Sequence, residues 1–160
     1  MDHPNIRAAV PSDAETIFGF ICDLAEFENA RHEVETDIAA ITETVFGENS
    51  VCDALIYEDE GKPLAFALWY YTYSTWQGRA GLYLEDLYVS PDARGRGIGS
   101  TILKYLANYA LEKGYGRFEW SVLDWNTPAI KTYDATGAKP QSEWIRYRLS
   151  GTDLQDFAKA

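Results

Sequence analysis

The feature that most constrains the fold is a change of hydrophobic period across a glycine-rich hexapeptide. Residues 82–89 are rich in β-forming side chains, whereas residues 98–114 repeat apolar side chains at the spacing of one helix face. Between them stands Arg94-Gly95-Arg96-Gly97-Ile98-Gly99. Glycines let a backbone approach a ligand closely, and a helix N-terminus presents unpaired N–H groups to an anion. The block predicts a strand, a turn and a helix. On glycine content alone, a pyrophosphate cradle and a plain tight turn are equally good interpretations.

Two other phosphate-binding motifs fit this block less well. A P-loop needs Gly-Lys followed by Ser or Thr at the start of the helix, and that sequence is absent here. A dinucleotide fingerprint needs a third glycine where Ser100 stands, and it opens a parallel βαβ unit. Because several antiparallel-type β segments precede the block, we set aside the kinase and Rossmann interpretations.

The rest of the chain predicts a single α/β domain spanning residues 1–160, with an antiparallel first half and a β-α-β second half. Ser12 and Glu15 form a capping-box pattern that opens the first helix. The predicted order is βααβββαβαβ, with a C-terminal helical turn as an option. Expected strands cover residues 5–9, 51–57, 63–73, 82–89, 118–123 and 143–149, and expected helices end near Phe27, Gly47, Gly114 and Gly137.

Charge narrows the possible partners. The 25 acidic against 14 basic residues give a net charge of -11, which argues against general nucleic-acid binding and favours a small cationic substrate. Solubility alone also explains such a surface. We expect a cytoplasmic protein without a membrane span or secretion signal, with Cys22 and Cys52 as buried free thiols. His3 and His32 are too isolated to predict a metal site.

Taken together, the motifs resemble the GNAT acetyltransferase superfamily. Arg94-x-x-Gly97-x-Gly99 after a β segment is similar to the family's coenzyme A signature. Within the family, the chain most resembles the spermidine/spermine (diamine and thialysine) N-acetyltransferase branch. Matching segments follow the family's order over nearly the whole chain: Leu24-Ala25-x-Phe27-Glu28, Tyr71-Thr72-Tyr73-x-x-Trp76, Tyr83-Leu84-Glu85-Asp86, Gly97-Ile98-Gly99-Ser100, Trp125-Asn126-x-Pro128 and Tyr133-x-x-x-Gly137-Ala138.

The resemblance implies a mixed, mostly antiparallel sheet flanked by helices and splayed between its fourth and fifth strands, with the pantetheine arm in the gap. It also implies a homodimer and direct transfer of acetyl from acetyl-CoA to a primary amine of a diamine, polyamine or lysine-like amino acid. The coenzyme-binding residues that it implies are Leu87, Tyr88, Val89, Arg94, Gly95, Arg96, Gly97, Ile98, Gly99, Ser100, Asn126 and Tyr133.

The chemistry requires a group that deprotonates the amine, because alkyl ammonium groups have a pKa near ~10.4. Glu85 is the candidate general base. Strand alternation predicts that Glu85 shares a face with Tyr83 and Leu87, and that Asp86 lies on the opposite face. The alternative is an ordinary solvent-facing strand position for Glu85.

The resemblance assigns Tyr133 as the general acid that protonates the leaving thiolate, and it places backbone N–H groups of residues 87–89 near the oxyanion. It assigns Asn126 to the coenzyme arm. From the residues alone, Tyr133 is better explained as a core aromatic of a helix and Asn126 as a helix cap. Neither cysteine has an activating neighbour in sequence, so we expect no acetyl-enzyme.

Two residues match positions that hold the amine in the polyamine branch: Glu28 as a charge partner and Trp76 as a cation–π wall. Asp86 is a further candidate for attracting the amine. The alternative interpretation of Glu28 is a solvated charge at a helix end. The alternative for Trp76 is an aromatic loop residue that packs on the core. Ser74 stands where the polyamine binders carry an acid, which favours shorter diamines or a lysine-like amino acid over spermidine.

Two further functions remain open on sequence. One keeps the fold and the coenzyme but acetylates a protein lysine or N-terminus. The other is a non-catalytic acyl-CoA-binding module, against which the presence of both Glu85 and Tyr133 argues, because a pure binder needs neither.

Overall fold

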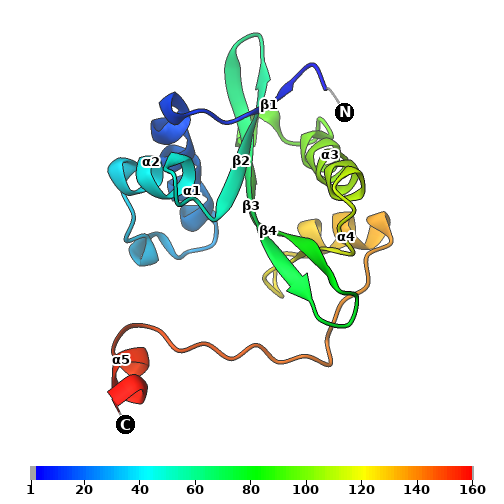
Figure 1. The fold of residues 1–160 in the computed structure, drawn as a ribbon. Coiled ribbons are helices and arrows are strands. Elements are labelled where there is room, and N and C mark those ends of the chain that lie inside the picture. Colours follow the sequence, from blue (N-terminus) through cyan, green and yellow to red (C-terminus); the bar gives the residue numbers. More distant parts are fainter. Residues whose placement is uncertain (1–2, 160) are drawn as a thin grey trace. The chain divides into compact units, whose positions relative to one another are not determined.

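The computed structural model describes residues 3–159. It comprises two compact units, Met1–Ser121 and Val122–Ala160, each described by itself (Figure 1). A single domain over 1–160 stays a prediction. The first unit contains β1 (Ile6–Ala8), α1 (Ala14–Phe27), α2 (Ile38–Phe46), β2 (Cys52–Asp59), β3 (Lys62–Ser74), β4 (Arg79–Val89), α3 (Ile98–Glu112) and β5 (Phe118–Trp120), and the second contains α4 (Thr127–Thr136) and α5 (Gly151–Lys159).

The first unit is built on a five-stranded sheet of order β1-β2-β3-β4-β5. Strands β1 to β4 pair antiparallel, and β5 pairs parallel to β4. Helices α1 and α2 cover one face of the sheet, and α3 covers the other (Figure 1). This arrangement confirms the predicted mixed, mostly antiparallel sheet flanked by helices.

Two apolar layers hold the helices on the sheet. On the α1 face, Ile17 and Phe20 pack with Phe66 of β3, and the Phe20 and Phe66 rings stack at 5.6 Å between centroids. On the other face, α3 buries Ile102 and Leu106 completely. Burial of side chains of this size contributes about 1.5–3 kcal/mol each, so these layers fix both helices against the strands that carry the site.

The start of α1 differs from the sequence prediction. No capping box forms between Ser12 and Glu15; Asp13 instead occupies the N-cap position of α1. Its buried carboxylate accepts the backbone N–H of Val10 at 2.8 Å and two bonds from the Arg7 guanidinium at 2.7 and 2.9 Å. A bidentate charged partner outcompetes the capping geometry, and it ties β1 to the beginning of α1.

The sheet opens beyond the middle of β4. Strand β5 pairs with β4 only from Leu82 to Leu84, whereas β4 continues to Val89. Among the described residues, the last part of β4 therefore has no strand partner on that side. This confirms the splay predicted between strands four and five, and it leaves every second backbone N–H and C=O of that stretch available to a ligand.

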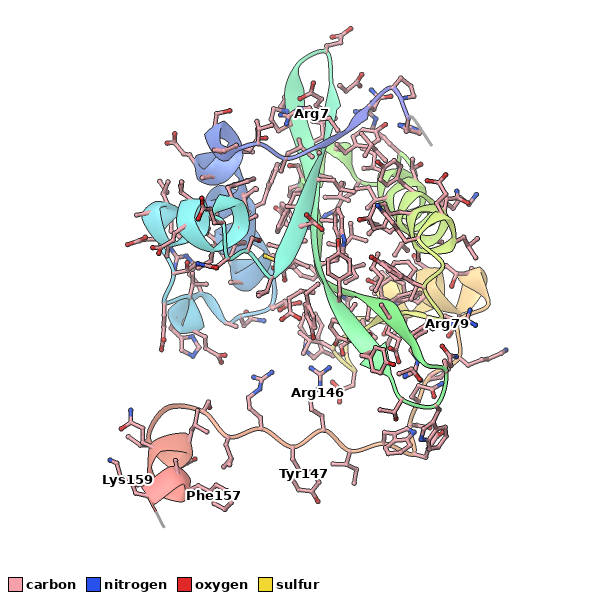
Figure 2. The ribbon with its side chains drawn as sticks, in the orientation of Figure 1. Arg7, Arg79, Arg146, Tyr147, Phe157 and Lys159 are labelled. Atoms are coloured by element: carbon pink, nitrogen blue, oxygen red, sulfur yellow. The ribbon has the colours of Figure 1, made fainter. Side chains whose placement is uncertain are left out.

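The second unit contradicts one predicted strand. Residues 143–149 are extended but make no ladder within the described part of the chain, and α5 follows them. Apolar alternation alone does not make a strand, which exists only where a neighbour pairs with it. The side chains of this segment are exposed: 71% for Trp144, 77% for Ile145 and 91% for Tyr147. Figure 2 shows the labelled Tyr147 side chain projecting from the extended segment.

None of the helices formed by residues 3–159 has the length and hydrophobicity needed to span a bilayer.

Candidate active site

A β-bulge in β4 lies at the centre of the candidate site. Asp86 pairs with Leu68 of β3, and Leu84 pairs with the next β3 residue, Trp69, so Glu85 is an extra residue without a partner. One inserted residue reverses the alternation of the strand beyond it. Asp86 therefore lies on the same face as Tyr83, the face covered by α1, and Leu87 lies on the opposite face. The predicted division of faces was wrong for this reason.

Three carboxylates converge next to the bulge. Burial, and then the charges of Glu85 and Glu28, raise the pKa of Asp86 from 3.8 to about 6. Glu28 follows the last residue of α1, and burial raises the pKa of its carboxyl as well. Glu85 is exposed, whereas Asp86 and Glu28 are half-buried. Such a group of like charges attracts a cation, because a bound ammonium would offset both the repulsion and the lost solvation.

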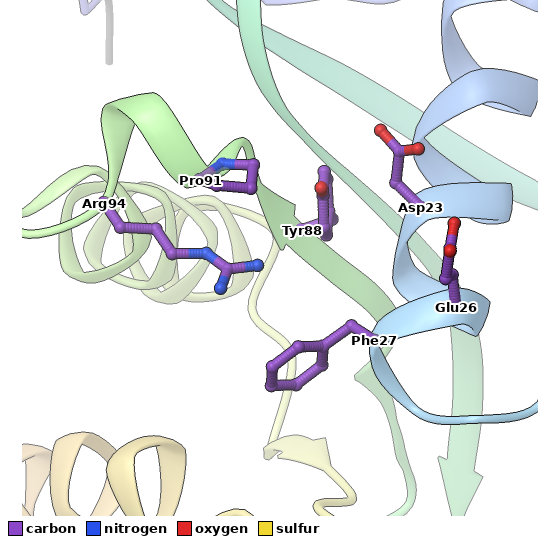
Figure 3. Close-up of a pocket in the computed structure, with 6 residues that line it drawn as sticks. All are labelled: Asp23, Glu26, Phe27, Tyr88, Pro91 and Arg94. Carbon is purple, nitrogen blue, oxygen red and sulfur yellow. The ribbon is translucent and has the colours of Figure 1, made fainter.

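A pocket of about 330 Å³ lies between α1 and the end of β4 (Figure 3). Arg94 extends over two aromatic rings of this pocket, 5.1 Å from the Phe27 centroid and 5.8 Å from the Tyr88 centroid. Its Nε donates to the carbonyl of Val89 at 3.1 Å. The lining residues are Asp23, Glu26, Phe27, Tyr88, Pro91 and Arg94. The wall is thus aromatic with charged groups of both signs.

The glycine-rich block has the backbone of an anion cradle. Gly95 and Gly97 have φ of 76° and 77°, in the left-handed region that disfavours side chains. A Cβ on either glycine would meet no atom within 4 Å, so backbone conformation and not crowding selects glycine. Gly97 caps α3 without a side-chain hydrogen bond, which leaves the first N–H groups of this 15-residue helix to an anion.

The other predicted coenzyme residues of the first unit differ in which of their groups are available to a ligand. Ile98 is 3% exposed and belongs to the core, so only its backbone can face a ligand. Arg96 forms an ion pair with Asp59 at 2.6 Å, which raises the pKa of Arg96. Residues 87–89 lie on the unpaired stretch of β4, and Gly99 and Ser100 form the first turn of α3. These residues therefore lie on β4, in the turn that follows it or in the first turn of α3.

Asn126 and Tyr133 belong to the second unit. Asn126 is the N-cap of α4 and its Oδ1 accepts from the N–H of Ala129 at 3.3 Å, as the cap interpretation predicted. Tyr133 lies in α4 and is half-buried. Their contributions to coenzyme binding and proton donation stay predictions.

Trp76 and Ser74 lie on the β3–β4 hairpin, away from the carboxylates. Trp76 is 89% exposed near the tip. Asp86 lies seven residues beyond Arg79, the first residue of β4, which is about 20 Å along a strand. The structure therefore does not bring Trp76 to the three carboxylates. Ser74 is buried, and its Oγ accepts from Arg117 at 2.7 Å and from the N–H of Gln77 at 3.2 Å. Its hydroxyl holds the hairpin together.

Most residues of the pocket wall were not predicted from the sequence. Phe27 appeared only as part of a matching segment, and Asp23, Glu26 and Pro91 were not singled out. A signal was present for Asp23 and Phe27, since they stand four residues apart in α1 and share a face of the helix.

Comparisons with known proteins agree with this geometry. The model of the acetyltransferase (GNAT) family matches residues 18–138. Thialysine N-epsilon-acetyltransferase of Mus musculus is 38% identical, with 99% of each chain covered. Spermidine/spermine N(1)-acetyltransferase-like protein 1 of Homo sapiens is 34% identical over 99% of this chain and 24% of its own length. L-ornithine N5-acetyltransferase of Arabidopsis thaliana is 37% identical over 59% of this chain and 41% of its own.

Among solved structures, an integron cassette protein from the mobile metagenome of V. cholerae superposes with a TM-score of 0.82 at 26% identity, with 97% of each chain covered. The family match spans the splayed strand, the bulge and the glycine-rich turn, and the full-length likeness to acetyltransferases agrees with it. The chain is therefore an acetyltransferase that belongs to the GNAT family.

Proposed function

We propose that the protein transfers the acetyl group of acetyl-CoA directly to a primary amine of a small cationic molecule: a diamine, a polyamine or a lysine-like amino acid. The observation that carries the proposal is the half-buried Asp86, whose carboxylate faces the like charges of Glu85 and Glu28. The same three negative charges would also attract a second ammonium group on the substrate. The names of the relatives give thialysine, ornithine and spermidine or spermine as acceptors. Each of these molecules carries more than one charged group.

Acetyl-CoA fits the residues at the start of α3. The left-handed Gly95 and Gly97 and the open N–H groups of α3 suit its pyrophosphate. The unpaired stretch of β4 offers hydrogen-bonding groups to an extended arm. When bound, acetyl-CoA supplies a thioester carbonyl as the electrophile.

The residues of this chain then manage charge and protons. The neighbouring carboxylates of Glu85 and Asp86 attract the ammonium, and one carboxylate of this pair removes its proton. Backbone N–H groups of residues 87–89 hold the negative charge that builds on the carbonyl oxygen. Tyr133 donates a proton to the departing sulfur, as the resemblance implies, and Asn126 contacts the coenzyme arm.

Direct transfer is supported by the state of the cysteines. Both are free and half-buried. Burial raises the pKa of the Cys52 thiol, which makes it a poorer nucleophile near neutral pH. A ternary complex of enzyme, acetyl-CoA and amine needs neither thiol.

We also propose that the protein forms a homodimer and that it is located in the cytoplasm. The exposed alternation of residues 143–149 supports a dimer, because an unpaired apolar segment of this kind is expected to pair with a second chain. Light scattering coupled to size-exclusion chromatography measures the mass in solution: a mass near twice 18.0 kDa supports the dimer, and 18.0 kDa contradicts it.

The activity is tested by thiol release from acetyl-CoA with thialysine, lysine, ornithine, putrescine and spermidine as acceptors. We expect turnover with a subset of these amines, and a large loss of kcat in Tyr133→Phe. Tyr73→Phe, which changes an exposed tyrosine of β3, is the matched control and should keep wild-type rates. Saturable coenzyme binding without turnover on any of the amines would contradict the small-amine proposal and leave a protein acceptor or a sensor.

A further inference from the structure

The β-bulge separates the two neighbouring carboxylates into different environments. Glu85 is the inserted residue and is exposed to water. Asp86 is half-buried on the α1 face, opposite the apolar Leu68. Within residues 3–159, the Asp86 carboxylate takes part in no hydrogen bond or ion pair. A desolvated carboxylate with no partner is costly, and it is normally found where a ligand completes it.

We infer that Asp86 is the group that accepts the proton of the substrate ammonium, and that Glu85 acts on it as a neighbouring charge. The inference rests on the proposed amine acetylation and names the proton acceptor within it.

The proton transfer balances as follows. One N–H bond of the ammonium breaks, an O–H bond forms on Asp86, and the nitrogen keeps the electron pair with which it attacks the thioester carbon. A C–N bond then forms and the C–S bond breaks. The thiolate takes the Tyr133 phenol proton to form its S–H bond, and the second N–H bond of the nitrogen breaks as the amide forms, which returns a proton to Tyr133. Overall, one ammonium and one thioester give one amide, one thiol and one proton, which passes to water.

The charges around Asp86 suit it to this step. The groups that act on it are Glu85 on its own strand and Glu28 at the end of α1, both negative. Together with burial they bring the pKa of Asp86 to about 6. A base with a pKa just below the working pH is mostly ionised and still binds a proton well, which is the best compromise for proton transfer. The ionised form also attracts the ammonium that it deprotonates.

The test compares Asp86→Asn, Glu85→Gln and wild type on two amines: the best diamine substrate and its difluorinated analogue, whose amino group is largely neutral at pH 8. We expect Asp86→Asn to lower kcat on the ordinary diamine by about 10²- to 10⁴-fold, the usual worth of a general base. The fold-reduction in kcat on the fluorinated amine should be at least about tenfold smaller, because that amine is already neutral and needs no base before it attacks. Asp37→Asn is the matched control, since Asn caps α2 as well as Asp does.

Glu85→Gln supplies the second readout. Removing one neighbouring charge should move the acid limb of the kcat/KM pH profile to lower pH while the limb persists, and Asp86→Asn should abolish the limb. An equal loss on both amines in Asp86→Asn, or an acid limb that survives in it, overturns the inference. Failure of wild type on every amine would instead be a failure of the proposed function.

Discussion

Replacing Asp86 with Asn should stabilise the folded chain, and the gain should grow as the pH rises. The pKa of Asp86 is raised from 3.8 to about 6 in the folded state, first by burial and then by Glu85 and Glu28. A raised carboxyl pKa favours the folded state fully below the unfolded value, and that advantage is lost as the pH rises through the folded value. An asparagine side chain does not titrate, so the variant does not lose stability as the pH rises through this pKa.

The magnitude follows from the size of the shift. At about 1.36 kcal/mol per pKa unit, the shift from 3.8 to about 6 amounts to about 3 kcal/mol at pH 8. Between pH 5 and pH 8, the difference in the free energy of unfolding between variant and wild type should grow by about 1.4 kcal/mol. The change with pH is the sharper quantity, because it is independent of how well the Asn side chain packs.

Urea unfolding followed by tryptophan fluorescence at pH 5, 6, 7 and 8 measures this difference. Asp92→Asn is a control of opposite sign. Lys62 lowers the pKa of the exposed Asp92, so that variant should lose a little stability above the unfolded pKa. If the gain of Asp86→Asn stays constant across the pH range, Asp86 is not held in an unfavourable ionised state, and the reasoning on its environment is refuted.

Other parts of the fold give three more expectations. Arg7→Ala leaves the buried Asp13 without its bidentate partner, and urea unfolding should show a loss of about 2–4 kcal/mol; a loss below about 0.5 kcal/mol would contradict that anchoring. Gly97→Ala forces a side chain into the left-handed region, so calorimetry should show weaker coenzyme A binding, and urea unfolding should show a cost of about 1–2 kcal/mol. Among residues 3–159, the buried Thr72 hydroxyl has no hydrogen-bond partner, so Thr72→Val should be neutral or stabilising by up to about 1 kcal/mol, and clear destabilisation in urea would contradict this.

The sequence predicted the parts of the fold that depend on local patterns. The predicted strands 51–57 and 63–73 are joined by a tight turn in which Glu60 and Gly61 both have positive φ, as a two-residue hairpin turn requires. Gly137 ends α4 in the left-handed conformation. The strand, glycine turn and amphipathic helix of the central block also form as predicted. In each case the residue type itself carries the conformational preference.

Features that depend on how strands pair could not be predicted from the residue pattern of a single segment. A bulge leaves no residue signature in Leu84-Glu85-Asp86, so alternation put Asp86 on the wrong face. The alternation of residues 143–149 likewise says nothing about whether a partner strand is present. The role of Ser74 depends on Arg117, which is 43 residues away in sequence and adjacent only in the folded sheet.

The proposal that this chain acetylates small cationic amines is tested most directly by mass spectrometry of the product, run together with quantification of released thiol. Acetyl-CoA would be incubated with thialysine, putrescine or spermidine. We expect one acetyl group on an amine of at least one acceptor, in an amount equal to the released thiol, and we expect this product to be lost in Asp86→Asn. Thiol release without acetylated amine, or no release with any of the three, would contradict it.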